Sequence, residues 1–167
     1  MPSSLVVLAV LQATLAPDSG EIHLRNIRQL TFGGQNAEAY FSRSGRQLIL
    51  QRTESDSAGC DQQFVINVDG TGLRRVSSGR GRTTCGYFYD GDRRILYATT
   101  EHDGPACPPK PDYSRGYVWA IYNYDIYTAK ADGSDLRRLT TNPATTPRPR
   151  SRRTAKPSSS RRCARET

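Results

Sequence analysis

A short segment with apolar residues at its first and fourth positions occurs three times in this chain, and it constrains the fold more than any other feature. The copies are IRQLT at 27–31, LRRVS at 73–77 and LRRLT at 136–140. The second and third copies each follow an Asp-Gly pair, within VDGTG at 68–72 and ADGSD at 131–135. Elements that recur in the same order indicate a fold assembled from repeated units of secondary structure.

Short runs of β-branched and aromatic residues flank these turns, and they predict antiparallel strands. Asp-Gly favours a tight hairpin because both residues tolerate positive φ. Further hairpins are expected around the polar turns 43–46 and 90–93. The expected strands are 39–42, 47–51, 63–67, 86–89, 94–98 and 124–128. Four short strands in a repeat of about 45 residues are typical of a β-propeller blade, so the predicted fold class is all-β.

The order of these elements resembles the repeat of TolB-like, WD-repeat-like propellers of the periplasm. The resemblance covers residues 26–142 and rests on LRRLT, an aromatic strand, a polar-Gly turn, a Leu-Ile strand and an Asn-x-Asp-Gly-Thr turn. The usual Ser-Pro-Asp-Gly turn reads SRSG at 42–45 and YDGD at 89–92. The resemblance implies that residues 23–143 form an incomplete β-propeller of about two four-stranded antiparallel blades. An incomplete ring leaves a blade edge exposed, so we expect marginal stability or self-association.

The same resemblance implies a non-catalytic scaffold for protein–protein interaction in the cell envelope, here as a truncated fragment, with no cofactor and a protein partner. The alternative is the N-terminal propeller fragment of a hydrolase of the prolyl-oligopeptidase or dipeptidyl-peptidase type. The chain contains no G-x-S-x-G, no G-x-x-x-x-G-K-[ST] and no H-E-x-x-H. We therefore expect no enzyme activity and no catalytic residue, with His23 and His102 in structural or exposed positions.

Residues 101–116 lengthen the second repeat and are rich in proline. Because proline cannot donate to a strand ladder, we expect this insertion to be a loop that leaves the blade. Such a loop either binds a partner or is a plain surface loop. The basic loop 79–82 faces either an anionic partner or solvent. The candidate partner-binding residues are Arg80, Arg82, Lys110, Tyr113 and Arg115, and we expect no nucleic-acid partner.

Two further sets of side chains have expected roles. Aromatic residues between 117 and 127 form either an adhesive surface or, by their alternation, core packing between blades, which is expected for Trp119 and its i+2 neighbours. Acidic residues occupy turn positions, where a carboxylate accepts local backbone hydrogen bonds. The aromatic set is Tyr117, Trp119, Tyr122, Tyr124 and Tyr127, and the acidic set is Asp69, Asp90, Asp92 and Asp132.

The four cysteines do not form a metal-binding pattern. Cys60, Cys85 and Cys107 lie in the repeats, and Cys163 lies in the tail. None belongs to a CxxC pair or has zinc-ligand spacing with a histidine, so no metal site is expected. Cys85 and Cys107 flank a strand and the loop that follows it. They form either a disulfide, if the protein is exported, or two partly buried thiols.

Residues 1–22 form either a weak signal peptide or an N-terminal strand. The apolar run LVVLAVL at 5–11 is followed by TLA at 14–16, which has the small residues of a signal-peptidase site. The run is too short to cross a bilayer, so no transmembrane segment is expected. A signal peptide implies a periplasmic or secreted protein, whereas an N-terminal strand implies a cytoplasmic one.

The basic charge is concentrated in residues 144–167. The formal net charge is +8, and this stretch holds eight of the 24 basic residues but one of the 16 acids. It lacks Val, Ile, Leu, Phe, Tyr and Trp, so we expect disorder. A usual third repeat in a GC-rich gene, read one nucleotide out of frame, yields TTPRPRSRRTA, the sequence at 145–155. We therefore expect an out-of-frame tail; the alternatives are a merely disordered tail and a basic arm for nucleic acid or anionic lipid.

Overall fold

The computed structural model describes residues 20, 21, 23–54, 59–118 and 120–141, and the chain divides into two compact units, residues 1–32 and 33–167. The described residues of the first unit contain no extended strand or helix, and within them the His23 N–H donates to Glu21 Oε1 at 2.8 Å. Residues 142–167 and all but two of residues 1–22 lie outside the described residues, and so do the predictions made for them.

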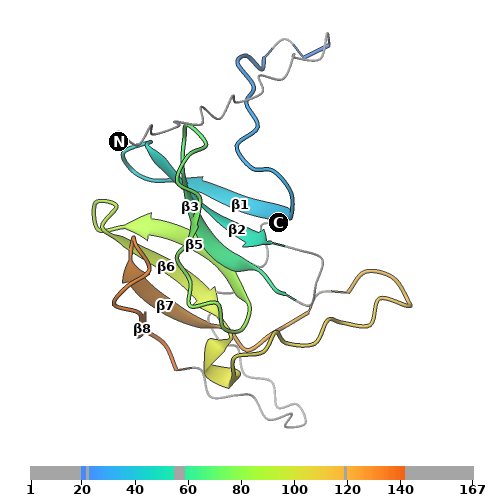
Figure 1. The fold of residues 1–167 in the computed structure, drawn as a ribbon. Coiled ribbons are helices and arrows are strands. Elements are labelled where there is room, and N and C mark those ends of the chain that lie inside the picture. Colours follow the sequence, from blue (N-terminus) through green and yellow to red (C-terminus); the bar gives the residue numbers. More distant parts are fainter. Residues whose placement is uncertain (1–19, 22, 55–58, 119, 142–167) are drawn as a thin grey trace, which may run out of the picture. The chain divides into compact units, whose positions relative to one another are not determined.

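The second unit is all-β and contains two four-stranded antiparallel sheets, as the repeats predict (Figure 1). Each sheet takes its strands in chain order, so every connection joins neighbouring strands. The first sheet is β1 (Gln35–Phe41), β2 (Gln47–Thr53), β3 (Gln62–Asn67) and β4 (Arg74–Arg75). The second is β5 (Thr83–Tyr89), β6 (Arg94–Thr99), β7 (Asp125–Lys130) and β8 (Arg137–Arg138), with the short 3-10 helix η1 (Glu101–Asp103) after β6. The described residues form these two sheets and no closed ring.

The two sheets pair their strands in the same register, which confirms the internal repeat in three dimensions. In the first sheet Tyr40 lies opposite Ile49, and Ile49 lies opposite Val65. The same three ladder positions of the second sheet are occupied by Tyr87, Leu96 and Thr128. The short last strands also correspond, since Arg74 and Arg75 pair with β3 as Arg137 and Arg138 pair with β7.

The first strand of each sheet carries a bulge at the same place. The register shifts between Ala37 and Tyr40 in β1 and between Thr84 and Tyr87 in β5. The backbone φ is positive within both bulges, at Glu38 and at Cys85. A bulge adds a residue to one strand and increases the local twist, so both sheets bend at the same place.

Both Asp-Gly turns join antiparallel strands as predicted, but positive φ is confined to the glycine of each pair, because neither Asp69 nor Asp132 adopts it. The Asp69 carboxylate accepts a hydrogen bond of 2.8 Å from the Thr71 N–H, and Asp132 accepts one of 2.9 Å from the Ser134 N–H. The glycine of each turn has a positive φ, 85° in the first turn and 89° in the second. The prediction of a local role for these two acids is confirmed.

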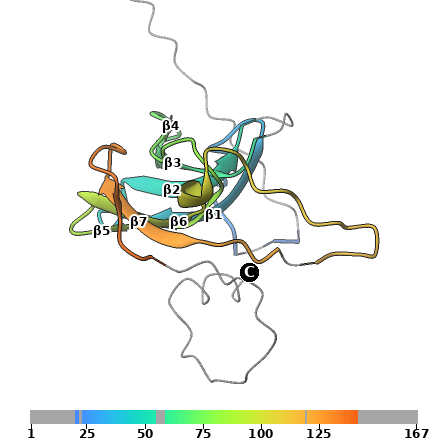
Figure 2. The same cartoon turned by 90° about the horizontal axis from the view of Figure 1, so that it is seen from below.

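The core lies between the two sheets. Alternate side chains of each sheet point into it, because successive residues of a strand face opposite sides. The most deeply buried members are Ile49, Val65, Ile95 and Ala129, each 0% exposed. The remaining members are Val76, Tyr97 and Tyr127, with Tyr40, Phe88 and Leu136 partly buried against the cluster. Figure 2 shows the sheets as two layers, with the β6–β7 loop extending to one side.

Polar contacts link the layers as well, among them the one from Gln63 Nε2 to Thr83 Oγ1 at 3.2 Å. The Asp92 carboxylate, in the β5–β6 turn, accepts hydrogen bonds from the backbone N–H groups of Arg43 and Ser44 in the β1–β2 turn. Arg74 Nη2 donates to the carbonyl oxygen of Ala131 at 3.1 Å. The prediction that Asp92 acts within its own turn is therefore wrong, because its side chain reaches the neighbouring sheet.

Candidate functional site

The chain between β6 and β7, residues 100–124, is a long loop that leaves the second sheet. Apart from η1 the structure assigns no helix or strand to its described residues. In both views the loop extends away from the sheets (Figures 1 and 2). The expected insertion at 101–116 therefore lies within a loop that begins before it and continues to Tyr124.

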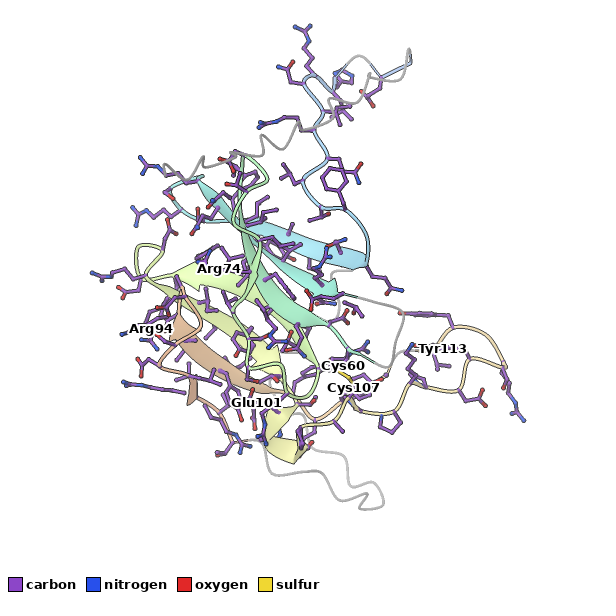
Figure 3. The ribbon with its side chains drawn as sticks, viewed as in Figure 1. Cys60, Arg74, Arg94, Glu101, Cys107 and Tyr113 are labelled. Atoms are coloured by element: carbon purple, nitrogen blue, oxygen red, sulfur yellow. A yellow bond between two sulfur atoms is a disulfide. The ribbon has the colours of Figure 1, made fainter. Side chains whose placement is uncertain are left out.

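A disulfide between Cys60 and Cys107 anchors this loop to the residues just before β3. The two Cα atoms are 5.7 Å apart, and the bond lies at the base of the loop, with Tyr113 further out (Figure 3). The predicted partner Cys85 is buried in the bulge of β5 and takes no part in the bond. The predicted pairing of Cys85 with Cys107 is wrong, because the fold brings the loop to Cys60.

The basic loop 79–82 meets the base of the β6–β7 loop. The Gly81 N–H donates to the Pro105 carbonyl at 3.1 Å, and Gln62 Nε2 donates to the Gly81 carbonyl at 2.8 Å. A Cβ at Gly81 would lie 2.7 Å from the backbone nitrogen of Glu101. The close approach of the two loops therefore requires glycine here.

Arg82 contributes to this junction through its side chain. Its guanidinium lies 3.2 Å from the Asp61 carboxylate and 5.5 Å from the ring centroid of Tyr122. Arginine over an aromatic face is a favourable cation–π arrangement. Of the two candidate arginines in the loop 79–82, Arg82 is held within the chain and Arg80 is exposed.

The outer part of the loop is a turn held by its own hydrogen bonds, and we call residues 112–117 the tyrosine tip. The Asp112 carboxylate accepts bonds from the Ser114 N–H and hydroxyl, both 2.9 Å long. These bonds hold the pKa of Asp112 below its usual value. The Gly116 N–H donates to the Tyr113 carbonyl at 3.0 Å, and the rings of Tyr113 and Tyr117 stack with centroids 5.9 Å apart.

The side chains of the tip, of Val118 and of Ile121 are exposed. Tyr117 is 75% exposed and Ile121 is 97% exposed, so the prediction that these neighbours of Trp119 pack in the core is wrong. Trp119 itself lies outside the described residues. The structure thus places three candidate residues, Lys110, Tyr113 and Arg115, exposed on one loop.

His102 lies in a separate polar cluster at the end of the second sheet. Its Nε2 is 3.5 Å from carboxylate oxygens of both Asp103 and Asp125, and its ring stacks on Tyr127. Asp125 is buried and accepts hydrogen bonds from Arg138 and from the Thr140 hydroxyl.

Two hydrogen bonds of this cluster have counterparts in the first sheet, so they belong to the repeated structure. In the first sheet the equivalent residues are Gln62 and Ser77, and the Ser77 hydroxyl donates to Gln62 Oε1 at 2.7 Å. The same hydroxyl accepts a hydrogen bond from the Gln63 backbone N–H. In the second sheet the Thr140 hydroxyl likewise donates to the Asp125 carboxylate and accepts a hydrogen bond from the Ile126 backbone N–H. Each sheet thus fastens its third strand to the residues after its fourth. Within the described part of the chain, no three His, Cys, Asp or Glu side chains gather as a metal site.

The sequence pattern did not predict several residues of this loop. The proline-rich composition indicates a loop only as far as Pro111, and the apolar residues that follow it resemble a strand. Val118 and Ile121 are exposed, however, and β7 begins only at Asp125. Residues 117–124 contain no Gly or Pro, so no strong local signal distinguished this part of the loop from a strand.

The chain matches no known protein family in a comparison with family profiles, and it matches no curated protein. The described residues include no helix with the length and apolar character needed to cross a bilayer.

Proposed function

We propose that this protein is a non-catalytic scaffold of propeller-type blades that binds a protein partner through its tyrosine tip. The observation that carries the proposal is a loop fixed at its base by a disulfide and exposing Tyr113 and Tyr117 at its far end. Tyrosine is enriched at protein interfaces because its ring offers a large apolar area and its hydroxyl a hydrogen bond.

The repeat supports the propeller part of the proposal. Two antiparallel sheets of four consecutive strands share one register and pack face to face. This is how neighbouring blades of a propeller are built. A rigid support of this kind positions a long loop without requiring that the loop form strands.

The disulfide supports an exported protein, in the periplasm or secreted. Structural disulfides persist in oxidising compartments and are rare in the reducing cytosol. The Cys60–Cys107 bond joins two segments 47 residues apart in the sequence and fixes the base of the binding loop. Fixing a loop before binding reduces the conformational entropy that binding must remove.

The tip has the chemistry of a small protein-binding surface. The stacked tyrosine rings, with Val118 and Ile121, provide apolar contact area. Lys110 and Arg115 are exposed on the same loop and add positive charge beside it. A partner with an apolar centre and acidic residues around it would complement this surface.

Site-specific crosslinking tests the proposal. A photoreactive phenylalanine analogue at Tyr117, in protein exported by its own host, should give one discrete adduct. The same analogue at Phe41, which is 69% exposed on β1, is the matched control and should give none. The partner identified in this way should bind the purified protein at least about tenfold more weakly when Tyr113→Ala and Tyr117→Ala are combined. Equal adducts at both positions, or unchanged affinity of the double variant, would refute the proposal.

A further inference from the structure

Proline restricts the backbone of the outgoing leg of the β6–β7 loop. Pro108, Pro109 and Pro111 have φ fixed at about −65°, and a residue that precedes a proline is confined to the extended or polyproline II region. Cys107, Pro108 and Lys110 each precede a proline, so every residue from 107 to 111 is restricted in φ or ψ. Residues 107–113 are assigned no helix, strand or turn, and none of them has a positive φ or a cis peptide bond. These restrictions favour polyproline II, a left-handed helix with about three residues per turn.

The exposure of residues 108–113 follows this period of three, and we call these residues the proline arm. Pro108 and Pro111 are half-buried, whereas the two residues that follow each of them are exposed. Residues three positions apart lie on one edge of a polyproline II helix. One edge of the arm is therefore partly covered by the protein, and two edges face solvent. The first solvent edge begins at Pro109 and the second begins at Lys110.

The proline arm is held in place along its length. It runs from Cys107, in the disulfide at the base of the loop, to Tyr113 further out (Figure 3). Between these ends the Tyr122 hydroxyl, on the returning leg of the loop, donates to the Pro109 carbonyl at 3.0 Å. The outer end enters the hydrogen-bonded turn of the tyrosine tip. The arm is thus ordered before a partner binds, so binding has less conformational entropy to remove.

The two solvent edges have the chemistry that an aromatic groove recognises. Proline-rich segments dock into grooves lined by aromatic side chains, because a polyproline II helix is ordered in advance. Pro109 supplies an exposed ring on the first edge, and Lys110 supplies a positive charge on the second. The Asp112 carboxylate is already hydrogen-bonded to Ser114, so the charge that the arm offers to a partner is that of Lys110. An acidic residue at the rim of the groove would complement it.

We propose that the proline arm is a preformed polyproline II helix that the partner protein receives in a groove lined by aromatic side chains, with an acidic residue opposite Lys110. The inference rests on the proposed function, because it places one partner against both the arm and the neighbouring tyrosine tip. It adds the kind of surface that this partner carries. Tyr113 belongs to both features, so a groove that takes the second edge of the arm leads directly to the tip.

Crosslinking at two positions separates this inference from the proposed function. A photoreactive lysine analogue at Lys110, in protein exported by its own host, is compared with the phenylalanine analogue at Tyr117. Both should capture the same protein, and the partner peptide attached at position 110 should contain an aromatic and an acidic residue. The lysine analogue at Arg46, which is exposed in the β1–β2 turn, is the control and should capture nothing.

Each crosslinking outcome supports or overturns a stated part. An adduct at Tyr117 without one at Lys110 would overturn the groove on the proline arm and leave the tip as the binding site. An adduct at Lys110 without one at Tyr117 would support the groove and overturn the role of the tip. Adducts at neither position would overturn both, and an adduct at Lys110 on a partner peptide without an aromatic residue would overturn the groove alone.

A substitution on the first solvent edge tests the contact itself. Pro109→Ala removes an exposed ring and should weaken binding of the captured partner at least about fivefold. Pro105→Ala is the matched control, because Pro105 is an exposed proline of the same loop outside the arm, and it should change Kd less than about twofold. Equal losses in the two variants would overturn the groove.

A second variant tests the preformed conformation. Pro108→Gly combined with Pro111→Gly keeps the four exposed side chains of the arm and frees its backbone. Binding should weaken about threefold or more at an unchanged Tm, because the partner must then order the arm itself. Equal binding by the native chain and by this double variant would overturn the preformed helix.

Discussion

The Asp92 carboxylate accepts a hydrogen bond of 2.9 Å from the backbone N–H of Ser44, so the β5–β6 turn of the second sheet is fastened to the β1–β2 turn of the first. Asp92 occupies the repeat position of Gly45, and both residues have positive φ, 67° and 68°. The rest of the turn differs, since Asp90 and Gly91 have positive φ whereas Arg43 and Ser44 do not, and only the second turn carries a side chain here that reaches the neighbouring sheet.

We predict that Asp92→Gly lowers the stability of the two-sheet unit. Glycine keeps the positive φ without strain, so the loss comes from the contacts to Arg43 and Ser44. Urea unfolding measures it. Asp90→Gly is the matched control, because Asp90 also has positive φ but its carboxylate bonds Arg93 of its own turn. An equal loss in both variants would contradict a specific link between the sheets.

The Asp92 link should also depend on pH. The N–H groups of Ser44 and Arg43 hold the pKa of Asp92 below its usual value of 3.8. A lowered folded-state pKa contributes stability that is present above the usual value and is lost as the pH falls through the lowered one. The stability difference between the native chain and Asp92→Gly should therefore be constant at neutral pH and shrink below about pH 4. A difference that persists undiminished at pH 2 would exclude this origin.

Gly86→Ala should destabilise the protein by about 1–3 kcal/mol through overpacking. A Cβ at Gly86 would lie 2.1 Å from Gln63 Oε1 and 2.9 Å from Ile49 Cδ1, both in the first sheet. The repeat supplies the control, because Ala39 occupies the equivalent place after the bulge of β1. Alanine is therefore compatible with the local backbone. Chemical denaturation that shows no loss for Gly86→Ala would contradict the packing of the two sheets.

Breaking the Cys60–Cys107 bond should lower the free energy of unfolding by about 4 kcal/mol, the chain-entropy value for its sequence separation of 47. Cys60→Ser, Cys107→Ser and the double variant should lose the same amount, because each removes one and the same bond. Peptide mapping without reduction checks the pairing. Cys85 should react with an alkylating reagent only after unfolding, since it is buried, and a linked peptide containing Cys85 would contradict the structure.

Asp125→Ala should cost about 3 kcal/mol, because it leaves Arg138 and Thr140 without their buried acceptor. Asp125→Asn should lose less, since an amide oxygen still accepts from the Thr140 hydroxyl. The order of the two variants in urea unfolding tests whether the strand contact or the charge dominates. A greater loss for Asn than for Ala would contradict the contact as described.

Most of the fold could be predicted from the repeat, because its turns and strands are determined by residues that lie close together in the sequence. The Asp-Gly turns and the alternating strands depend on neighbours a few residues away, and Asp69 and Asp132 behave as expected. Contacts between the sheets depend on residues far apart in the sequence. The reach of Asp92 to Ser44, across 48 positions, has no local signature.

The loop site was predictable only in part, for the same reason. Proline marked its first half, and Lys110, Tyr113 and Arg115 are exposed as expected of a loop. Three cysteines in the repeats allow three pairings, and spacing alone does not choose among them. The alternation of side chains suggested core packing for Tyr117 and Ile121, but both residues lie outside the strands and are exposed.

The disulfide also determines how the protein would respond to mechanical force. A pull applied at the two ends of the chain passes through the Cys60–Cys107 bond and bypasses the segment between these cysteines, whose sequence separation is 47. At about 3.4 Å per extended residue, roughly 160 Å of contour length stays hidden until the bond is reduced. The strands β3 to β6 lie within this bypassed segment, so under tension they remain shielded while the strands outside it carry the load.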